Sequence, residues 1–357
     1  MNYFATVLPG LEDLLIEEIK YRCFEIVVTK TNRGKVFFTT TLDIEHLKSL
    51  RLANNLYLVI SELEIGLHRI HLHQLRDQVS RINLKPFLKK ATSYYVNASR
   101  KGSHTYSRFE AANAAMEGIK KRYPSKRFSR SRLADAEFRL DIEDHYGLFS
   151  LKLTHASYRF RQIDRGFSAG SLLPTVAHAM VWLSAPVEED IFIDPCCGSG
   201  TILWERLSYP FTYIGGGDIN HQAFKAAKEN LMDTFAEVTH WDARQLAIAD
   251  ASIDKVVTNL PFGRQISFGR ETNEINRAIL TEITRVMKTQ GKAVILTENW
   301  DEILQVAASL HLRLLKSFPL SLKGLHPTIY VFEKVKHKSG FLQMDTSLQQ
   351  MPNFSKY

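Results

Sequence analysis

Four short segments in the second half of the sequence combine acidic or amide side chains with glycine, a combination that suits ligand binding. They are DPCCGSGT at 194–201, GGGD at 215–218, WDA at 241–243 and NLPFG at 259–263. Glycine lets a backbone turn sharply and approach a ligand, and the first N–H groups of a following helix are free to donate to it. The first segment is neither G-x-G-x-x-G nor a Walker A sequence, which needs a lysine after the last glycine. A tight strand–helix turn without a ligand is the alternative interpretation.

The acids of these segments have the chemistry of nucleoside recognition. A carboxylate at Asp218 can accept both hydroxyls of a ribose, as in other nucleoside-binding sheets, and Asp242 is suited to receive the amino group of an adenine. Cys196 and Cys197 are either small packing residues or nucleophiles. We favour packing, because no second catalytic acid or base accompanies them.

The elements that must position these segments alternate regularly. After a helix over 173–185, the pattern predicts strands that end at the four segments, with helices from Thr201, over 221–232 and near 272–288 between them. A further strand at 292–298, another helix and a closing strand pair at 312–320 and 328–336 follow. This order predicts an α/β fold with a doubly wound, mostly parallel sheet, in which ligands bind beyond the carboxyl ends of the strands.

The first half has a different order of elements. Strands are expected at 2–8, 25–30, 35–40, 57–63, near 94–100, at 138–144 and at 146–154. Helices are expected over 11–22, near 43–52, from about His71 and over 110–123. Mixed elements in this order predict one or two small α+β units that end near residue 155.

Charge is also divided between the two halves. The chain of 357 residues carries 46 Lys+Arg against 38 Asp+Glu, a net charge of +8, and 45% of its residues are hydrophobic. Residues 120–132, KKRYPSKRFSRSR, contain no acid, and their aromatic residues could stack on bases while the cations neutralise phosphates. A solvated basic loop is the alternative. In 184–254, by contrast, acids outnumber bases, so we expect the two halves to have different tasks.

Several classes of protein are disfavoured. Three cysteines are too few for a disulfide framework or a Cys-only zinc site, and His68, His71 and His73 lack ligands at metal-binding spacing. No apolar run approaches the ~20 residues that span a bilayer, and the start lacks the pattern of a signal peptide. These features predict a cytoplasmic protein without a metal or a membrane partner.

The four segments, in this order and spacing, resemble those of S-adenosylmethionine-dependent methyltransferases of the seven-stranded class. NLPFG is similar to their (N/D)-P-P-(Y/F) motif, and the stretch VNASRKGSHTYSRFEAANAA resembles a THUMP domain. Together these features are similar to the THUMP-containing tRNA guanosine-N2 methyltransferases, to about residue 336. The resemblance implies a ferredoxin-like domain at 1–65, a THUMP RNA-binding domain at 66–155, a linker at 156–170, a Rossmann-like methyltransferase domain at 171–336 and a tail at 337–357.

The resemblance also implies a role for each candidate residue. The methionine part of S-adenosylmethionine would lie beside Asp194 and a turn formed by Cys197, Gly198, Ser199, Gly200 and Thr201. Its ribose would contact Asp218. Its adenine would contact Ile219, Asp242 and Ala243. The catalytic segment would be Asn259, Leu260, Pro261 and Phe262. The RNA-binding candidates are Arg100, Lys101, Lys120, Lys121, Arg122, Lys126, Arg127 and Arg130.

The catalytic segment suits transfer of a methyl group to an exocyclic amine. Such an amine is a poor nucleophile until its N–H groups are held, and the Asn259 side-chain oxygen and the Leu260 carbonyl can accept them. Pro261 stiffens the segment, and Phe262 can stack on an extruded base. Leu260 replaces the commoner proline, which disfavours adenine-N6 activity.

The resemblance therefore predicts a tRNA methyltransferase that forms N2-methylguanosine, with the sixth position of the acceptor stem as the leading target. We expect the chain to act as a monomer. A 23S ribosomal RNA guanosine-N2 methyltransferase shares the motifs, and a non-catalytic RNA-binding protein that retains the fold is an alternative from another class. No function is assigned to the tail.

Overall fold

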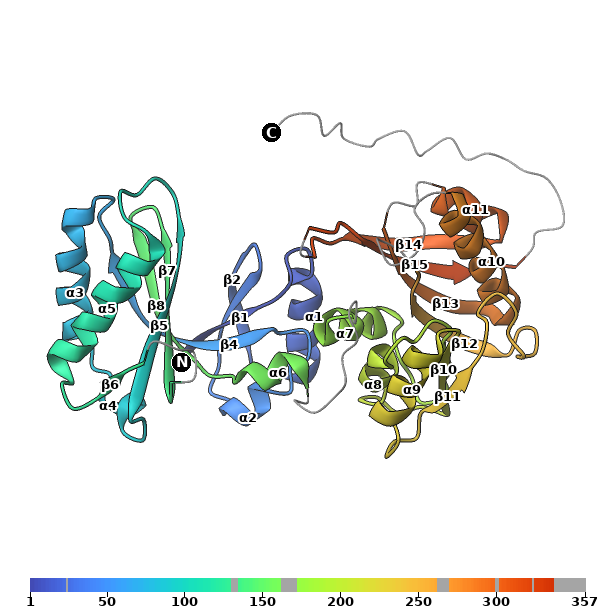
Figure 1. Cartoon of the computed structure of the whole chain (residues 1–357), viewed down its shortest axis with the longest axis horizontal. Helices are drawn as coiled ribbons and strands as arrows, with labels where there is room; N and C mark the ends of the chain where they lie inside the picture. Colours follow the sequence, from blue (N-terminus) through green and yellow to red (C-terminus); the bar gives the residue numbers. More distant parts are fainter. Residues whose placement is uncertain are drawn as a thin grey trace.

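Two sheets dominate the computed structural model, which describes residues 1–23, 25–129, 134–161, 172–261, 270–298, 302–322 and 324–336 (Figure 1). The first sheet has eight strands in the order β2-β3-β1-β4-β8-β7-β5-β6. Its strands are β1 (Asn2–Thr6), β2 (Val27–Asn32), β3 (Lys35–Thr39), β4 (Asn55–Glu64), β5 (Ser93–Lys101), β6 (Arg127–Phe128), β7 (Ala136–Glu143) and β8 (Tyr146–Lys152). The long strand β4 pairs with β1 near its start and with β8 along its length, so one sheet spans both small α+β regions.

The helices of this half cover two separate cores. We call residues 1–56 the proximal unit and residues 57–152 the distal unit; the distal unit lies at the left of Figure 1. The proximal unit carries α1 (Glu12–Arg22) and α2 (Ile44–Leu47). The distal unit carries a 3-10 turn (Arg69–His71), α3 (Leu72–Arg81), α4 (Lys85–Leu88) and α5 (Arg108–Arg122).

Local chemistry explains how α5 begins and packs. The Ser107 hydroxyl accepts from the backbone N–H of Glu110, and the Glu110 carboxylate accepts from the backbone N–H of Ser107, which forms a capping box. Small residues then bring α5 close to α3: a Cβ at Gly118 would lie 2.4 Å from the carbonyl oxygen of Arg76. These contacts bury the apolar face of α5 in the core of the distal unit.

One expected helix is much shorter than its sequence pattern suggests. The helix predicted near 43–52 is limited to α2, capped by Asp43. The buried carboxylate of Glu18 on α1 accepts the backbone N–H groups of Arg51 at 2.9 Å and Leu52 at 2.8 Å. Because these N–H groups are used by a distant side chain, they do not continue the helix.

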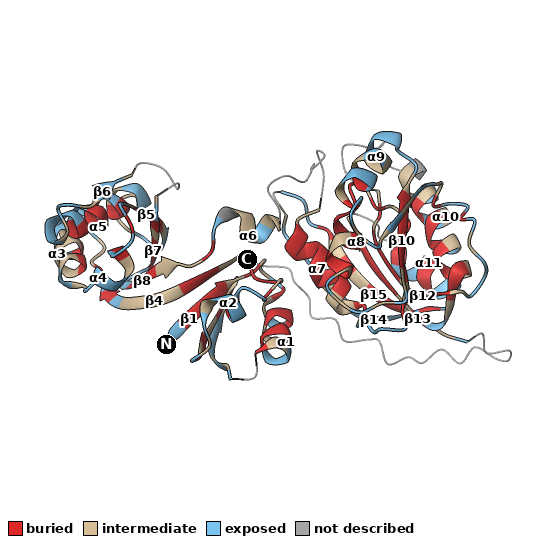
Figure 2. Cartoon of the chain, turned by 90° about the horizontal axis from the view of Figure 1, so that it is seen from below, coloured by how far each residue is buried: buried red, intermediate tan, exposed pale blue. Residues whose placement is uncertain are grey.

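The second sheet has seven strands in the order β11-β10-β9-β12-β13-β15-β14, which confirms the α/β fold class. The five strands from β11 to β13 are parallel, and β15 is antiparallel to both of its neighbours. Figure 2 shows the central strands of this sheet as a buried layer between helices, whereas the edge strands β11 and β14 are mostly exposed. The strands are β9 (Ile191–Asp194), β10 (Tyr213–Asp218), β11 (Glu237–His240), β12 (Ile253–Asn259), β13 (Met287–Thr297), β14 (Leu312–Pro319) and β15 (Thr328–Lys334).

The second sheet and its helices form the C-terminal lobe, residues 172–336. Its helices are α7 (Pro174–Leu183), α8 (Thr201–Arg206), α9 (His221–Asn230), α10 (Arg270–Val286) and α11 (Ile303–Ser309). Ahead of them, the segment expected to be a linker contains a short helix, α6 (Ala156–Phe160). One hydrophobic core joins α1 and β3 of the proximal unit to α7 and β9 of the lobe. The proximal unit therefore packs against the lobe, and the distal unit extends from it (Figure 1).

Two observations concern the classes of site discussed above. No helix among the described residues combines the length and the apolar character that crossing a bilayer requires. Within the same residues, no three His, Cys, Asp or Glu side chains gather as a metal site would need. Of the three histidines that are close together in sequence, His68 donates its backbone N–H to Nδ1 of His71 at 3.3 Å, a bond that caps the 3-10 turn.

Candidate active site

Three neighbouring parallel strands bring the predicted polar residues to one edge of the second sheet. In the pairing register, Gly216 of β10 lies opposite Asp194 of β9, and Val256 of β12 lies opposite Ile193 of β9. Asp194, Asp218 and Asn259 are the last residues of their strands. They therefore lie at the carboxyl edge, where open α/β sheets bind ligands.

The turn after β9 is fixed by its own backbone. The N–H of Cys197 donates to the carbonyl of Gly217 at 2.9 Å, and the N–H of Gly200 donates to the carbonyl of Cys197 at 2.8 Å. Gly198 and Gly200 have φ of 55° and 80°, a region that side chains disfavour. The glycines thus permit a turn that leads directly into α8 at Thr201.

Alanine at either glycine is expected to destabilise the fold by about 1–3 kcal/mol, because the backbone conformation becomes strained. A Cβ at Gly198 would meet no atom within 4 Å, whereas one at Gly200 would lie 2.7 Å from Cδ1 of the buried Leu231. Gly200→Ala should therefore lower the free energy of unfolding more than Gly198→Ala, as measured by urea titration. Equal losses would show that Leu231 moves aside freely.

Asp194 is a fully buried acid with an incomplete set of partners. Its Oδ1 accepts the N–H of Cys196 at 3.2 Å, but its Oδ2 has no partner among the described residues. Burial raises the pKa of this carboxyl to about 7. The hydroxyl of Thr201 is also buried and has no partner among the described residues, and a hydrogen bond from the buried Thr258 partly offsets the raised pKa of Asp194. Unsatisfied buried polar atoms are rare in proteins, so this group fits a site that a polar ligand completes.

Asp218 is oriented by two backbone donors. Its Oδ2 accepts the N–H of Gly198 and its Oδ1 accepts the N–H of Asn220, both at 2.9 Å. Each carboxylate oxygen has a second lone pair, so two hydroxyls can still be accepted. The neighbouring Ile219 side chain is 59% exposed and offers an apolar surface at the same edge.

Asp242 has a partner that the sequence interpretation missed. The guanidinium of Arg244 pairs with its carboxylate, with the shortest contact at 2.6 Å, and this bonding lowers the pKa of Asp242. An adenine amine at Asp242 would have to share the carboxylate with Arg244. The sequence did contain a signal for this ion pair, because Asp242 and Arg244 are separated by a single residue. Beside this pair, Ala243 is buried, and Nε1 of Trp241 donates to the carbonyl of Pro195 at 2.9 Å, which ties this segment to the turn after β9.

We call the described part of the predicted catalytic segment, Asn259 to Pro261, the Asn259 segment, and it contains another buried acceptor. The side-chain oxygen of Asn259 has no partner among the described residues, although it is inaccessible to water. The N–H of Leu260 donates to the carbonyl of Leu296 at 3.0 Å, and Asn276 of α10 donates its Nδ2–H to the carbonyl of Pro261 at 3.3 Å. Asn276 is a second residue that the sequence interpretation missed. Phe262 lies outside the described residues.

The two cysteines of the turn have the environment of packing residues. Burial raises the pKa of both thiols, and the nearby acids, Asp194 first, raise it further. A thiol that stays protonated is a poor nucleophile. This environment supports the packing interpretation of Cys196 and Cys197.

The predicted RNA-binding residues fall into two groups rather than one patch. Strand β6 pairs with the start of β5, so Lys126 and Arg127 lie near Ser93. Arg100 and Lys101 are at the other end of β5, about 20 Å away at ~3.3 Å per residue. The last turn of α5, close in sequence to β6, carries Lys120, Lys121 and Arg122. Arg130 lies outside the described residues.

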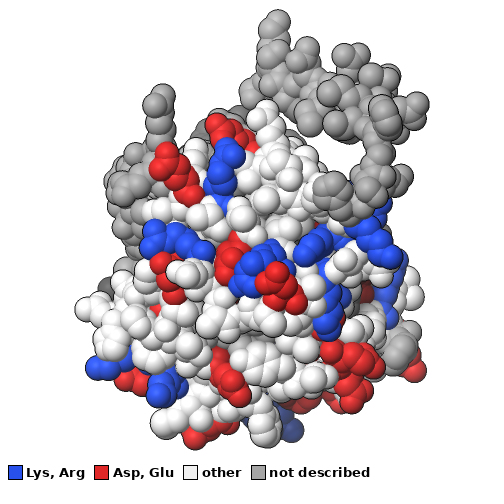
Figure 3. Space-filling model, turned by 90° about the vertical axis from the view of Figure 1, so that its right-hand side faces the viewer, with Lys and Arg blue, Asp and Glu red and all other residues white. Residues whose placement is uncertain are grey.

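Several of these cations already have partners within the distal unit. Lys101 pairs with Glu143 at 2.5 Å and Lys121 with Asp77 at 3.1 Å, while Arg122 donates to the carbonyl of Arg81 at 2.8 Å. Lys120 and Arg127 are exposed. On the face of the C-terminal lobe shown in Figure 3, basic and acidic side chains are interspersed among the described residues.

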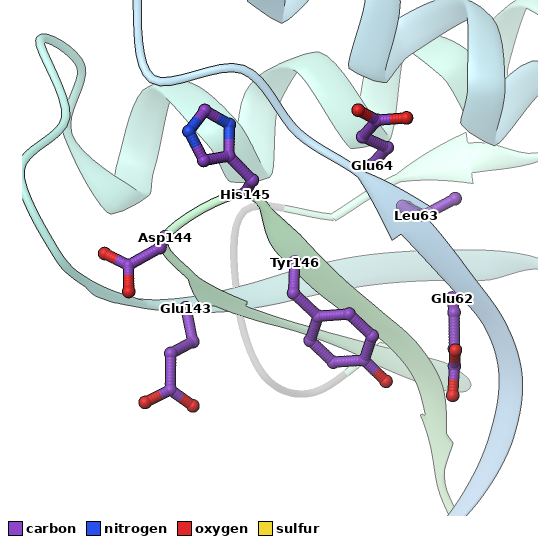
Figure 4. Close-up of a pocket in the computed structure, with 7 residues that line it drawn as sticks. All are labelled: Glu62, Leu63, Glu64, Glu143, Asp144, His145 and Tyr146. Carbon is purple, nitrogen blue, oxygen red and sulfur yellow. The ribbon is translucent and has the colours of Figure 1, made fainter.

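A cavity of about 530 Å³ lies away from this edge, between β4 and the β7–β8 turn. It is lined by Glu62, Glu64, Asp144, His145 and Tyr146, among others. Figure 4 shows that its carboxylates point in different directions rather than toward one point. The cavity contains none of the residues of the candidate active site.

Comparison with known proteins identifies the C-terminal lobe. Residues 161–328 match the family described as RMKL-like, methyltransferase domain. The chain is 28% identical to the bovine tRNA (guanine(6)-N(2))-methyltransferase THUMP3 over 219 residues, which cover 56% of this chain and 43% of that protein. It thus spans less than half the length of that relative.

Two matches from Thermus thermophilus extend over nearly the whole chain. The tRNA (guanine(6)-N2)-methyltransferase of that organism is 25% identical over 337 residues, which cover 93% of this chain and 99% of that protein. The crystal structure of TrmN from the same organism superposes with a TM-score of 0.78 at 24% identity, covering 94% of this chain and 99% of that one. The chain shares its fold with this structure.

Proposed function

We propose that this chain, whose C-terminal lobe carries a methyltransferase domain, is a tRNA methyltransferase that uses S-adenosylmethionine to form N2-methylguanosine. The observation that carries the proposal is the carboxyl edge of the second sheet. There, Asp194, Asp218 and Asn259 are the last residues of three neighbouring strands. Buried side-chain oxygens of Asp194 and Asn259 have no hydrogen-bond partner among the described residues. The names of the relatives support the same reaction.

The residues at this edge fit S-adenosylmethionine. The Oδ2 of Asp194, which has no partner in the described part of the chain, and the glycine turn suit its methionine part. The remaining lone pairs of Asp218 suit the two ribose hydroxyls. The exposed Ile219 offers a surface for the adenine ring. When bound, this cofactor supplies an electrophilic methyl group.

The Asn259 segment would activate the nucleophile. The lone pair of an exocyclic amine is delocalised into the base, so holding both N–H groups redirects it. The side-chain oxygen of Asn259 accepts one proton, and the backbone carbonyl of Leu260 accepts the other. Asn276 keeps Pro261, and with it this segment, in position. Most of the acceleration then comes from proximity and orientation.

The first half of the chain would hold the RNA. Its basic residues form two separated groups on the distal unit, and we propose that this unit, with the THUMP-like sequence, binds tRNA and presents its acceptor stem, with position 6 as the target. We also propose a cytoplasmic monomer. The ferredoxin-like, THUMP, linker and methyltransferase boundaries given above belong to this proposal.

Mass spectrometry of nucleosides tests the reaction. The purified chain is incubated with S-adenosylmethionine and either tRNA or ribosomal RNA, and each RNA is then digested. We expect N2-methylguanosine in the tRNA digest alone. The same product in ribosomal RNA alone would favour the ribosomal alternative, and N6-methyladenosine as the only product would overturn the guanosine assignment. Absence of cofactor binding in calorimetry would favour a non-catalytic RNA-binding protein.

Charge reversal on the distal unit tests the RNA-binding role. The double variant Lys126→Glu, Arg127→Glu should weaken tRNA binding and reduce the slope of log affinity against log salt by about 2, because two phosphate contacts are lost. Lys20→Glu, Lys30→Glu, on exposed positions of the proximal unit, is the control with the same charge change. Fluorescence anisotropy at several salt concentrations measures both. Equal slopes for the two double variants would assign the 120–132 stretch to a solvated loop.

A further inference from the structure

A second cavity lies between the segment that follows α2 and the segment that leads from β8 into α6, and two of its lining residues, Arg51 and Arg161, contact Glu205 of the C-terminal lobe. Its volume is about 480 Å³, and its lining includes Lys48, Ser49, Arg51, His155 and Arg161. Lys48, Ser49 and Arg51 follow α2, and His155 caps α6. The cavity is thus separate from the carboxyl edge of the second sheet and from the basic groups of the distal unit.

Positive charge exceeds negative charge at the wall of this cavity. The Nε atoms of Arg51 and Arg161 both donate to the carboxylate of Glu205 on α8, at 2.9 and 3.0 Å. Glu205 is completely buried, and its pKa is lowered to about 2 against the effect of burial by His178 and by the two guanidinium groups. Two cations thus share one carboxylate, which leaves a net charge of about +1 at the wall, and Lys48 is a further cation that pairs with Glu45.

The guanidinium groups are held in position before any ligand arrives. Arg161 also donates to the carbonyls of Tyr158, at 3.0 Å, and Arg51. Its backbone has φ of 64°, an unusual conformation for a residue other than glycine. Arg51 keeps 25% of its side chain exposed and donates to Glu205 through Nε. A rigid, partly exposed guanidinium suits a phosphate, which it can bind with two parallel hydrogen bonds.

We infer that this cavity binds a phosphate of the substrate RNA backbone. The inference rests on the proposed function. Helix α6, which contributes Ser157 and Tyr158 to the cavity lining, lies in Figure 1 between the distal unit, which we propose holds the RNA, and the lobe that carries the Asn259 segment. An RNA backbone that reaches from the distal unit to the lobe along the side of α2 and α6 would pass this cavity. A phosphate bound here would contact the proximal unit and α6 directly, and the lobe through Glu205.

Two variants test this site without removing the Arg51–Glu205–Arg161 contacts. Lys48→Glu reverses a charge at an exposed lining position, and Ser49→Asp adds a charge while it leaves the contact of Lys48 with Glu45 intact. Lys20→Glu, exposed on α1, is the control for a charge reversal away from the cavity lining. The full chain is titrated with tRNA by fluorescence anisotropy between 50 and 200 mM KCl.

We expect Lys48→Glu and Ser49→Asp each to weaken tRNA binding about 3- to 10-fold and to reduce the salt slope by about 1, since one phosphate contact is lost. Lys20→Glu should keep the wild-type slope. If both cavity variants had the same salt slope as Lys20→Glu, the inference would be overturned. A second result would also overturn it. If inorganic phosphate protected the wild-type chain but neither variant against thermal unfolding, while the salt slope of tRNA binding stayed unchanged, the ligand would be a free anion.

These measurements are separate from the test of the proposed function. If the chain binds tRNA with the expected slopes but methylates no nucleoside, the proposed function fails and the phosphate site stands. If N2-methylguanosine forms and the slopes do not change, the phosphate site fails and the proposed function stands.

Discussion

Replacing Asn259 with alanine is expected to lower kcat for tRNA methylation by about 100- to 1,000-fold, the range seen when one oriented hydrogen-bonding group at a reacting centre is removed. The side-chain oxygen of Asn259 is buried and has no partner among the described residues, so its only proposed partner is the amine of the substrate. Affinity for S-adenosylhomocysteine, measured by calorimetry, should change less than threefold, because that affinity does not depend on this bond.

Stability gives a second readout for the same variant. A buried acceptor without a partner costs about 1–3 kcal/mol in the free protein. Asn259→Ala removes that cost, so the free energy of unfolding should not fall by more than about 1 kcal/mol, although a small cavity is created. A variant that lost cofactor affinity while keeping kcat would contradict the catalytic role. A variant that lost stability and kcat together would point to a structural role.

Much of the candidate site could be predicted because it depends on local sequence. Alternating strands and helices place Asp194, Asp218 and Asn259 at strand ends, and parallel strands bring their ends to one edge. Glycine at 198 and 200 also had a local explanation, since both positions have positive φ. Such features follow from the period of the apolar residues and from the few conformations that a tight turn allows.

The remainder depended on contacts between residues far apart in sequence. Glu18 ends the second helix early by accepting N–H groups more than thirty residues away. Strand β4 pairs with β1 of the proximal unit and with β8 of the distal unit, so one sheet continues across the predicted boundary near residue 65. The parallel pairing of β5 with β6 separates Arg100 and Lys101 from the other basic residues. Neither charge pattern nor periodicity reports such pairings.

Asp194 provides the other large expected effect, through pH. The pKa of its carboxyl is raised from 3.8 to about 7 by burial, so the folded chain binds a proton that the unfolded chain has released. Stability from this group is complete below about pH 4 and is lost as pH rises toward 7. Asp194→Asn should therefore be more stable than the wild type at pH 8, by up to a few kcal/mol, and should differ little near pH 4.

Cofactor binding should show the opposite dependence on pH. The ammonium group of the methionine part, bound near Oδ2, would favour the ionised carboxylate and release a proton on binding. The affinity of the wild-type chain for S-adenosylhomocysteine should therefore rise between pH 6 and 8, by no more than tenfold per unit, and Asp194→Asn should bind weakly with little pH dependence. Calorimetry in buffers of different ionisation enthalpy counts the protons released. Proton release that persists in Asp194→Asn would assign the titration to another group and would remove Asp194 from the cofactor site.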